Sequence, residues 1–241
     1  RALIERAKNA GCSALVLTLD LQIIGQRHKD LKNQMTAPPK LTLANLINMA
    51  TKPRWCAGML TTRRHSFGNV VGHAKGVENL TSLSAWSVEQ LDPSLSWDDV
   101  AWVKEQWGGK LILKGIMDAE DAVIAANLGI DAIIVSNHGG RQLDGSRSPF
   151  DQIAEITDAV GDDIDVILDG GVRRGTHVLK ALAAGAKACS GGRLYLYALA
   201  AAGQPGVERA LQNLKIEIER DMKLLGVSSI SQLNRDMLRQ R

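Results

Sequence analysis

The segment AEDAVIAANLGIDAIIVSN, residues 119–137, decides the fold class of this chain. Its first half is typical of a helix, Gly129 suits a helix C-terminus, and the apolar run that follows is typical of a buried strand. The same order recurs at residues 4–20 and 176–192, where Gly11 and Gly185 take the place of Gly129. In each segment an alanine stands three residues after the glycine. Repeated helix–glycine–strand units predict a parallel α/β fold.

Two further apolar runs, LILK and VILD, add strands to this pattern. Because these runs do not alternate with polar residues, we expect strands that are buried on both faces. The sequence then predicts one domain over residues 1–241, with a long insertion that includes a helical stretch at 41–50, and with C-terminal helices at 205–238. The five expected strands are residues 14–20, 111–114, 132–136, 166–169 and 187–191, and the insertion is residues 21–95.

The composition excludes several classes of protein. Of the 241 residues, 45% are hydrophobic and 23% are charged, as in globular proteins and unlike disordered, collagen-like or coiled-coil chains. No apolar run reaches the ~18 residues of a spanning helix, and no signal segment follows Arg1. Three cysteines without a CxxC spacing favour neither a disulfide framework nor a zinc site. We therefore expect a cytoplasmic protein without a metal.

Positive charge is concentrated in one part of the chain. The formal net charge is +3, but residues 21–75 contain nine Lys or Arg and one acidic residue, which gives this segment +8 and the remainder −5. A basic block on a mildly acidic body indicates an anionic surface or partner. A solvated loop would account for the same charges.

Every predicted strand ends in polar or glycine-rich sequence. In a (β/α)8 barrel the active site lies at the carboxyl ends of the strands, and the last two strands often carry a phosphate site. Here these two strands are followed by DGGVRRG, residues 169–175, and GGR, residues 191–193. Glycine lets backbone N–H groups approach a phosphate, and arginine adds further donors. The two loops predict a phosphate site, with tight turns and solvent-facing arginines as the alternative.

The string SNHGGRQLDG, residues 136–145, carries the expected chemistry. His138 should share one rim with Asp20, Lys114 and Arg141, because all four follow or end a predicted strand. A histidine oriented by a carboxylate is a good general base, an arginine can bind a substrate carboxylate, and a lysine can stabilise an anion that develops on a cofactor. The other histidines, at positions 28, 65, 73 and 177, are expected to be structural or solvated.

The chain resembles the FMN-dependent 2-hydroxy-acid dehydrogenase/oxidase family over essentially its whole length, and within it the bacterial L-lactate dehydrogenases of the cytochrome or quinone type. The resemblance rests on LTLDLQIIGQRHKD, LDPSLSWDDVAWVKEQW, LILKGI, SNHGGRQLDG, LDGGVRRG and GGRLYLYALA. It implies a TIM (β/α)8 barrel with FMN, of which this chain would hold five of the eight strands. The chain would be a C-terminal fragment that begins in the helix before the fourth strand.

The resemblance also implies an activity. The full-length protein would oxidise an L-2-hydroxy acid, L-lactate first, to the 2-oxo acid and pass electrons from FMN to a respiratory quinone or cytochrome. It would bind no nucleic acid, form a homo-oligomer and attach peripherally to the inner face of the plasma membrane. The alternatives are an oxidase that uses O2, another FMN barrel such as an isomerase, and a truncated half-barrel that binds flavin or phosphate without catalysis.

The resemblance assigns roles residue by residue. His138 would be the base and Asp20 its carboxylate partner, while Arg27 and Arg141 would bind the substrate carboxylate. One departure concerns the last strand, where Ser190 and Gly191 replace the branched apolar residue that is commoner in the family and would loosen the phosphate loop. The residues implied to bind FMN are Thr18, Lys114, Ser136, Asp169, Gly170, Gly171, Arg173, Gly192 and Arg193.

Overall fold

The computed structural model describes residues 1–23, 25–33, 42–62, 68, 70 and 91–239. The chain forms two compact units, one of residues 1–21 together with 95–241, and one of residues 22–94. The second unit matches the predicted insertion 21–95 to within one residue at each end.

The first unit is built on a five-stranded parallel sheet in which the strands pair in chain order. This arrangement confirms the α/β class and the order of the predicted strands. β2 is longer than predicted because its ladder continues past Lys114 through a register shift to Ile116. β1 ends before Asp20, β3 before Ser136 and β5 before Gly191, which leaves these residues in loops. The strands are β1 (Ala14–Thr18), β2 (Lys110–Ile116), β3 (Ala132–Val135), β4 (Asp165–Asp169) and β5 (Ala188–Ser190).

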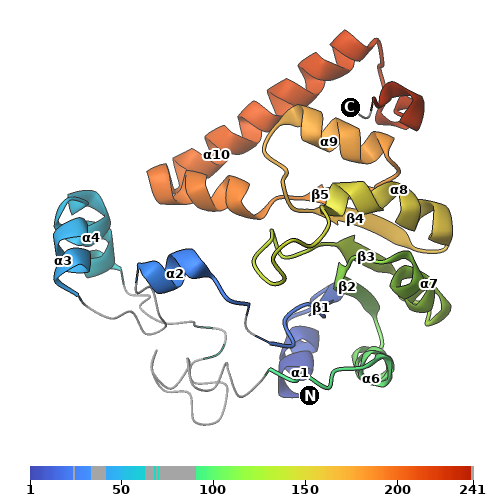
Figure 1. Ribbon diagram of the computed structural model, residues 1–241, viewed down its shortest axis with the longest axis horizontal. Coiled ribbons are helices and arrows are strands. Elements are labelled where there is room, and N and C mark those ends of the chain that lie inside the picture. Colours follow the sequence, from blue (N-terminus) through green and yellow to red (C-terminus); the bar gives the residue numbers. More distant parts are fainter. Residues whose placement is uncertain (24, 34–41, 63–67, 69, 71–90, 240–241) are drawn as a thin grey trace. The chain divides into compact units, whose positions relative to one another are not determined.

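Helices connect the strands as the repeated units predict. In Figure 1, α7 and α8 lie next to each other along one side of the sheet. Local sequence sets their starts: Asp118 accepts a hydrogen bond from the Glu120 N–H at the start of α7, and Pro149 occupies the first turn of α8. The helices of this part are α1 (Ala2–Asn9), α6 (Trp97–Trp107), α7 (Ala119–Asn127), α8 (Pro149–Val160) and α9 (Gly175–Ala183).

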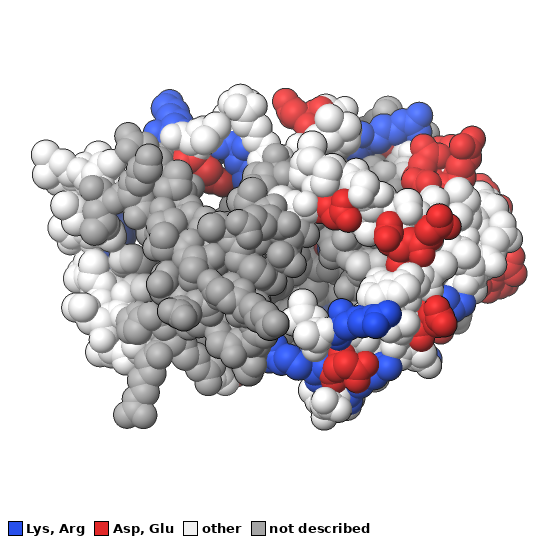
Figure 2. Space-filling model, turned by 90° about the horizontal axis from the view of Figure 1, so that it is seen from below, with Lys and Arg blue, Asp and Glu red and all other residues white. Residues whose placement is uncertain are grey.

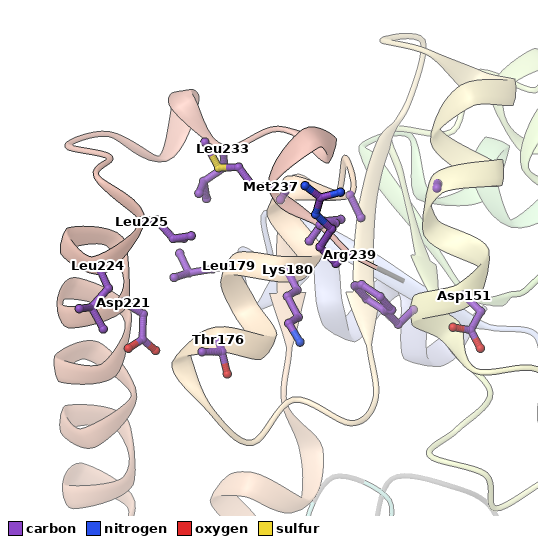
Figure 3. A pocket seen from close by; sticks show the side chains of 15 residues that line it. Asp151, Thr176, Leu179, Lys180, Asp221, Leu224, Leu225, Leu233, Met237 and Arg239 are labelled. Carbon is purple, nitrogen blue, oxygen red and sulfur yellow. The ribbon is translucent and has the colours of Figure 1, made fainter. Parts of the chain in front are cut away.

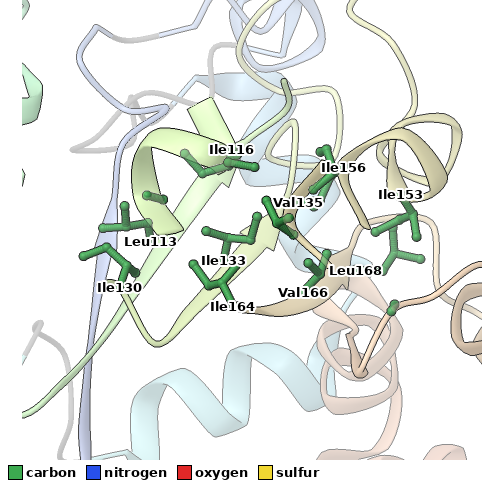
Figure 4. Close-up of a cluster of buried hydrophobic side chains, with 14 of the residues drawn as sticks. Leu113, Ile116, Ile130, Ile133, Val135, Ile153, Ile156, Ile164, Val166 and Leu168 are labelled. Carbon is green, nitrogen blue, oxygen red and sulfur yellow. The ribbon is translucent and has the colours of Figure 1, made fainter. Parts of the chain in front are cut away.

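The hydrophobic core lies between the sheet and these helices. Leu113 of β2 and Ile133 of β3 belong to one cluster with Ile153 and Ile156 of α8, which also contains the other labelled side chains (Figure 4). All four side chains are fully buried. Burying a side chain of this size contributes ~1.5–3 kcal/mol, so this cluster fixes the strands and with them the positions of their carboxyl ends.

The opposite face of the sheet is less buried than the sequence predicts. Ile112, Ile134 and Ile167, which alternate with the core residues, are only half-buried, and Val16 is 48% exposed. The prediction of strands buried on both faces is therefore wrong for the described residues. The physical reason is that the core packs against the other face, while this face carries Lys114 and the polar side chains at the strand ends.

The C-terminal part has a helix that starts near the predicted residue 205, but it differs from the predicted 205–238 at both sides, since another helical part precedes it and the α-helix ends at Leu225. α10 (Gly192–Leu225) begins earlier, because the apolar run after Gly192 continues directly into the tail. Non-helical dihedral angles at Ala202 and Gly203 divide this helix in two. Between Gly226 and Arg239, the last described residue, the chain forms two short 3-10 helices, η1 (Ile230–Gln232) and η2 (Arg235–Met237).

The tail packs against the helical layer and borders a cleft. Arg235 Nη1 donates to both carboxylate oxygens of Asp158 at 2.6 and 2.8 Å, and its Nη2 donates to Thr157 Oγ1. Between α8, α9, α10 and the tail lies a mainly apolar cleft of about 390 Å³, in which Leu179 and Leu225 face each other (Figure 3). This cleft shares no lining residue with the second cleft, which lies at the carboxyl ends of the strands and is described below.

The second unit is helical where it is described. Thr42 accepts the Asn45 N–H at 3.2 Å at the start of α3, which lies within the predicted helical stretch 41–50. α3 packs against α4, and large apolar side chains of both helices remain exposed. The helices are α2 (His28–Lys32), α3 (Leu43–Ala50) and α4 (Pro53–Thr61).

The basic block falls partly outside the described residues. Lys40, Arg63, Arg64 and Lys75 lie there, as do His65 and His73. On the face shown in Figure 2, basic and acidic side chains are interspersed over the described surface.

Candidate active site at the strand ends

A buried network joins three neighbouring strands at their carboxyl ends. Lys114 Nζ donates to Ser136 Oγ at 2.8 Å and to Asp169 Oδ2 at 2.9 Å. Ser136 Oγ donates in turn to the same Asp169 oxygen at 2.6 Å. Ser136 is fully buried and Asp169 nearly so. The register of the parallel strands places Lys114 and Asp169 on the same face of the sheet, which is why residues far apart in sequence meet here.

Asp169 is held in its charged form. Burial alone would raise the pKa of this carboxyl group, but hydrogen bonds from Ser136 and Lys114, the charge of Lys114 and a hydrogen bond from Ser190 outweigh burial. The net effect is an Asp169 pKa below its ordinary value. The site therefore contains a partly buried lysine–carboxylate pair with an oriented hydroxyl.

Ser136 connects this network to His138. The His138 backbone N–H donates to Ser136 Oγ at 3.1 Å, so the hydroxyl accepts two hydrogen bonds and donates one. His138 has φ +58°, and Gly139 and Gly140 follow with φ +68° and +71°. A left-handed conformation is uncommon for a residue with a side chain, and here it turns the chain sharply after β3.

His138 and Asp20 form the predicted pair. His138 Nδ1 lies 3.3 Å from Asp20 Oδ1, and both side chains are largely removed from solvent. Gln142 Nε2 donates to the Asp20 carbonyl oxygen at 2.8 Å, which ties the same loop to the end of β1 a second time. The second carboxylate oxygen of Asp20 is buried and has no hydrogen-bond partner among the described residues. A buried acceptor of this kind suits a donor supplied by a bound molecule.

Gly115 makes room for Asp20. It lies inside β2 with φ +105°, and a Cβ atom there would lie 2.8 Å from Asp20 Cβ and 2.9 Å from its Cγ and backbone N. No side chain fits at this distance without displacing the aspartate. The glycine of LILKGI is therefore a site residue, although it carries no functional group.

The two glycine-rich loops line a cleft next to this network. The cleft has a volume of about 300 Å³, and Gly170 and Gly171 enter it with φ +104° and +73°. It contains nine of the predicted site residues: Lys114, His138, Arg141, Asp169, Gly170, Gly171, Arg173, Gly192 and Arg193. The residues that were not predicted are Gly139, Val172, Ser190, Gly191 and the first turn of α10 from Leu194 to Leu196.

The arginines of the two loops take different positions. Arg193 Nη2 donates to the Gly139 carbonyl oxygen at 2.6 Å, which links the start of α10 to the His138 turn. The Arg173 side chain is exposed at the cleft. Arg174 lies outside the cleft lining and pairs with Glu217 of α10, whose carboxylate also accepts the Gly175 N–H at 2.8 Å. Because Glu217 caps α9, the donors near the cleft that an anion could use include the backbone N–H groups of Gly170–Val172 and Gly191–Arg193 and the Arg173 side chain.

Four predicted residues are not lining residues of this cleft. Asp20 and Ser136 belong to the hydrogen-bonded network beside it, and the other two are Thr18 and Arg27. Thr18 ends β1 and pairs in register with Lys114, one strand away from the network. Arg27 belongs to the second unit, where it precedes α2, and its Nε is buried without a partner among the described residues. The described residues contain no group of three or more His, Cys, Asp or Glu side chains that could hold a metal ion.

Sequence signals exist for some of the residues that were missed. An isolated glycine inside a strand, as at Gly115, is a sign of close backbone approach. Ser190 stood out as a departure from the family pattern, and the structure gives it a hydrogen bond to Asp169. Gln142 reaches across 122 positions to Asp20, a contact that no local pattern announces.

The family model described as FMN-dependent dehydrogenase matches residues 1–240. The chain belongs to this family. The match confirms the resemblance that the sequence motifs indicated, and it covers nearly every residue of the chain.

Similar proteins agree with this assignment. The L-lactate dehydrogenase of Caulobacter sp. (strain K31) is 43% identical over 242 residues, which cover 99% of this chain and 63% of that protein. The L-lactate dehydrogenase of Caulobacter vibrioides (strain NA1000 / CB15N) is 39% identical, and the match covers 100% of this chain and 63% of that protein. The chain thus spans less than two thirds of the length of these relatives.

Solved structures support the same fold. The monotopic membrane protein (S)-mandelate dehydrogenase has a TM-score of 0.92 and 35% identity, with 99% of this chain and 63% of that chain covered. The flavin-binding domain of baker's yeast flavocytochrome b2 has a TM-score of 0.72 and 34% identity, and the match covers 98% of this chain and 49% of that chain. The five-stranded sheet of this family member is therefore part of a TIM-barrel architecture.

Replacing Gly115 by Ala tests the close approach to Asp20. We expect this variant to lose ~1–3 kcal/mol of unfolding free energy more than Gly11→Ala, measured by urea denaturation. Both glycines have positive φ, but nothing lies within 4 Å of a Cβ at Gly11, so the control isolates the clash from the backbone strain. Equal losses in the two variants would show that Gly115 is not needed for the position of Asp20.

Replacing Asp169 by Asn tests the charge state of the network. Because its folded pKa is lowered, Asp169 stabilises the fold above the ordinary Asp pKa of ~3.9, and this contribution is lost as pH falls through the folded value. The difference in unfolding free energy between wild type and Asp169→Asn should therefore narrow as the pH falls from 7 to 3. Asp162→Asn, at an exposed position, serves as the control and should change the unfolding free energy only slightly. A difference in unfolding free energy between wild type and Asp169→Asn that stays constant or widens on acidification would contradict a lowered pKa of Asp169.

Proposed function

We propose that this chain holds FMN in the cleft at the strand ends and forms the catalytic part of an L-2-hydroxy-acid dehydrogenase that acts on L-lactate. The observation that carries the proposal is the continuous connection from Lys114 through Ser136 to His138 and Asp20, beside a cleft bordered by two glycine-rich loops. The names of the Caulobacter relatives support lactate as the substrate.

The residues of the cleft fit FMN. A phosphate needs several N–H donors that can approach closely, and Gly170, Gly171 and Gly192 offer backbone without side chains next to Arg173 and Arg193. The ring of a flavin gains negative charge on reduction, and the ammonium group of Lys114 is suited to stabilise it. When bound, FMN supplies the two-electron acceptor that no side chain provides.

His138 is proposed to act as the base. Oxidation of a 2-hydroxy acid to a 2-oxo acid removes two electrons and two protons from the substrate. With Nδ1 directed at Asp20, Nε2 is the nitrogen left to take one of these protons, and the Asp20 carboxylate stabilises the resulting imidazolium.

Two arginines are proposed to hold the substrate. The Arg141 guanidinium lies at the cleft, where it can bind a carboxylate through two parallel hydrogen bonds. Arg27 is proposed as the second carboxylate ligand on the basis of the family resemblance.

His138→Gln tests the proposed base. In the FMN-loaded chain under anaerobic conditions, we expect L-lactate to reduce the flavin at least ~10²-fold more slowly in this variant, with FMN still bound, as followed by loss of flavin absorbance. His28→Gln, at an exposed position of the second unit, is the control and should leave the rate unchanged. A rate near that of wild type would remove His138 from this role, and a wild-type chain that binds no FMN would refute the flavin site itself.

We further propose that the second unit attaches peripherally to an anionic membrane, from which a respiratory acceptor takes the electrons. α3 and α4 expose Leu43, Ile47 and Leu60 by 75%, 60% and 85%. Lys52 and Arg54, which lie between Ile47 and Leu60 in the sequence, are exposed as well. None of the described helices is long and apolar enough to cross a membrane. The similar mandelate dehydrogenase is described as monotopic, which supports attachment to one face. Each basic residue near an anionic leaflet adds ~1 kcal/mol of binding.

Sedimentation with phosphatidylserine-containing vesicles tests this attachment. We expect the chain to bind vesicles at low salt, and we expect binding to weaken as salt screens the charges. Lys52→Gln combined with Arg54→Gln should weaken it, and Leu60→Ser should weaken it without changing its salt dependence. Lys187→Gln in the first unit is the control. Absence of binding at low salt, or equal binding by all variants, would refute the proposal.

A further inference from the structure

His177 contacts the phosphate loop at two points. Its Nδ1 lies 3.2 Å from the Arg173 backbone N and 3.1 Å from the Gly171 carbonyl oxygen. His177 is the third residue of α9, so its side chain reaches back from the first helical turn to the loop that precedes the helix. The sequence placed this histidine among those expected to be structural or solvated, and the family resemblance assigned it no role.

Both contacts cannot form with the same proton position. With the proton on Nε2, Nδ1 accepts a hydrogen bond from the Arg173 N–H, and with a proton on Nδ1 it donates to the Gly171 carbonyl. In either form the imidazole ties the loop to α9. The contact therefore survives an exchange of tautomers, although its partner changes.

The remaining anchors of this loop lie on either side of these two residues. Asp169 is held by Lys114 and Ser136, and Gly175 is held by Glu217. Between these two anchors, the hydrogen bonds that the described residues make to Gly171 and Arg173 come from His177. The side chain of Val172, which lies between them, is buried. Gly171 has φ +73°, a conformation that glycine leaves easily when nothing holds it.

We propose that His177 is a positioning residue for a phosphate monoester: by binding the Gly171 carbonyl or the Arg173 N–H, it holds residues 171–173 so that the Gly171 and Val172 N–H groups and the Arg173 guanidinium are available to the cleft. The proposal rests on the proposed FMN site, because that cleft is where the phosphate would bind. A loop that must order itself on binding loses affinity through the entropy of ordering, and a loop held in advance does not.

Two substitutions separate positioning from general stabilisation. His177→Ala removes both contacts. His177→Asn places an amide oxygen or nitrogen at the position of Nδ1, one bond from Cγ, so it can still accept from Arg173 or donate to Gly171. If the hydrogen bonds of His177 hold the loop, His177→Asn should restore the properties that His177→Ala loses. If His177 only packs against the loop, the two variants should behave alike. His28→Ala is the matched control in the second unit.

Amide hydrogen exchange of the ligand-free chain provides the first readout. We expect exchange at residues 171–174 to be faster in His177→Ala and near wild type in His177→Asn, with the core of the sheet unchanged in both. This measurement does not depend on FMN. Unchanged exchange at Arg173 in His177→Ala would overturn the proposal.

Titration with FMN and with riboflavin, which lacks the phosphate, provides the second readout. We expect His177→Ala to bind FMN ~5- to 10-fold more weakly, the effect of about one hydrogen bond, with riboflavin affinity unchanged and FMN affinity recovered in His177→Asn. Equal weakening for both flavins would overturn the role toward phosphate. If the wild-type chain binds neither flavin, the proposed function fails, and the exchange measurement alone decides whether His177 holds the loop.

Discussion

The Asp169 carboxylate, shared by the Lys114 ammonium and the Ser136 hydroxyl, is the interaction on which the rest of the site depends. It joins three neighbouring strands through one oxygen atom, and the same hydroxyl accepts the His138 N–H that starts the left-handed turn. Removing one member of a buried ion pair is costly because the other is left without compensation. The network therefore orients the lysine, the turn and the base together, and no one of them can move without the others.

The apolar side of the sheet makes this arrangement possible. Ile133 and its neighbours pack against α8 and fix the strand register, and the register determines which side chains meet at the carboxyl ends. Glycines then provide the space that side chains would fill, at Gly115 behind Asp20 and at Gly170 and Gly171 beside the cleft. The site is thus built from two kinds of position, those where a functional group is required and those where its absence is required.

Sequence patterns predict the sheet and most of the cleft, because helix–glycine–strand units are local and polar residues at strand ends are visible in the sequence. They are less successful where a boundary or a contact depends on tertiary structure. The helical part of α10 before Ala202 was not predicted, whereas the part after the break at Ala202 and Gly203 starts near 205, as the sequence indicates. Gln142 and His177 were missed because their partners are backbone atoms, which carry no sequence signal. Arg27 lies in the second unit, so its role remains a prediction from the family resemblance.

The cleft at the strand ends is proposed to hold FMN between the lysine network and the glycine-rich loops. A crystal structure of the chain grown with FMN tests this proposal most directly. We expect the phosphate among residues 170–173 and 191–193, and the flavin ring next to Lys114 with Asp169 still paired to the lysine. Flavin bound elsewhere, for example in the apolar cleft beside Leu179 and Leu225, or a phosphate at the Glu217-capped start of α9, would contradict the account.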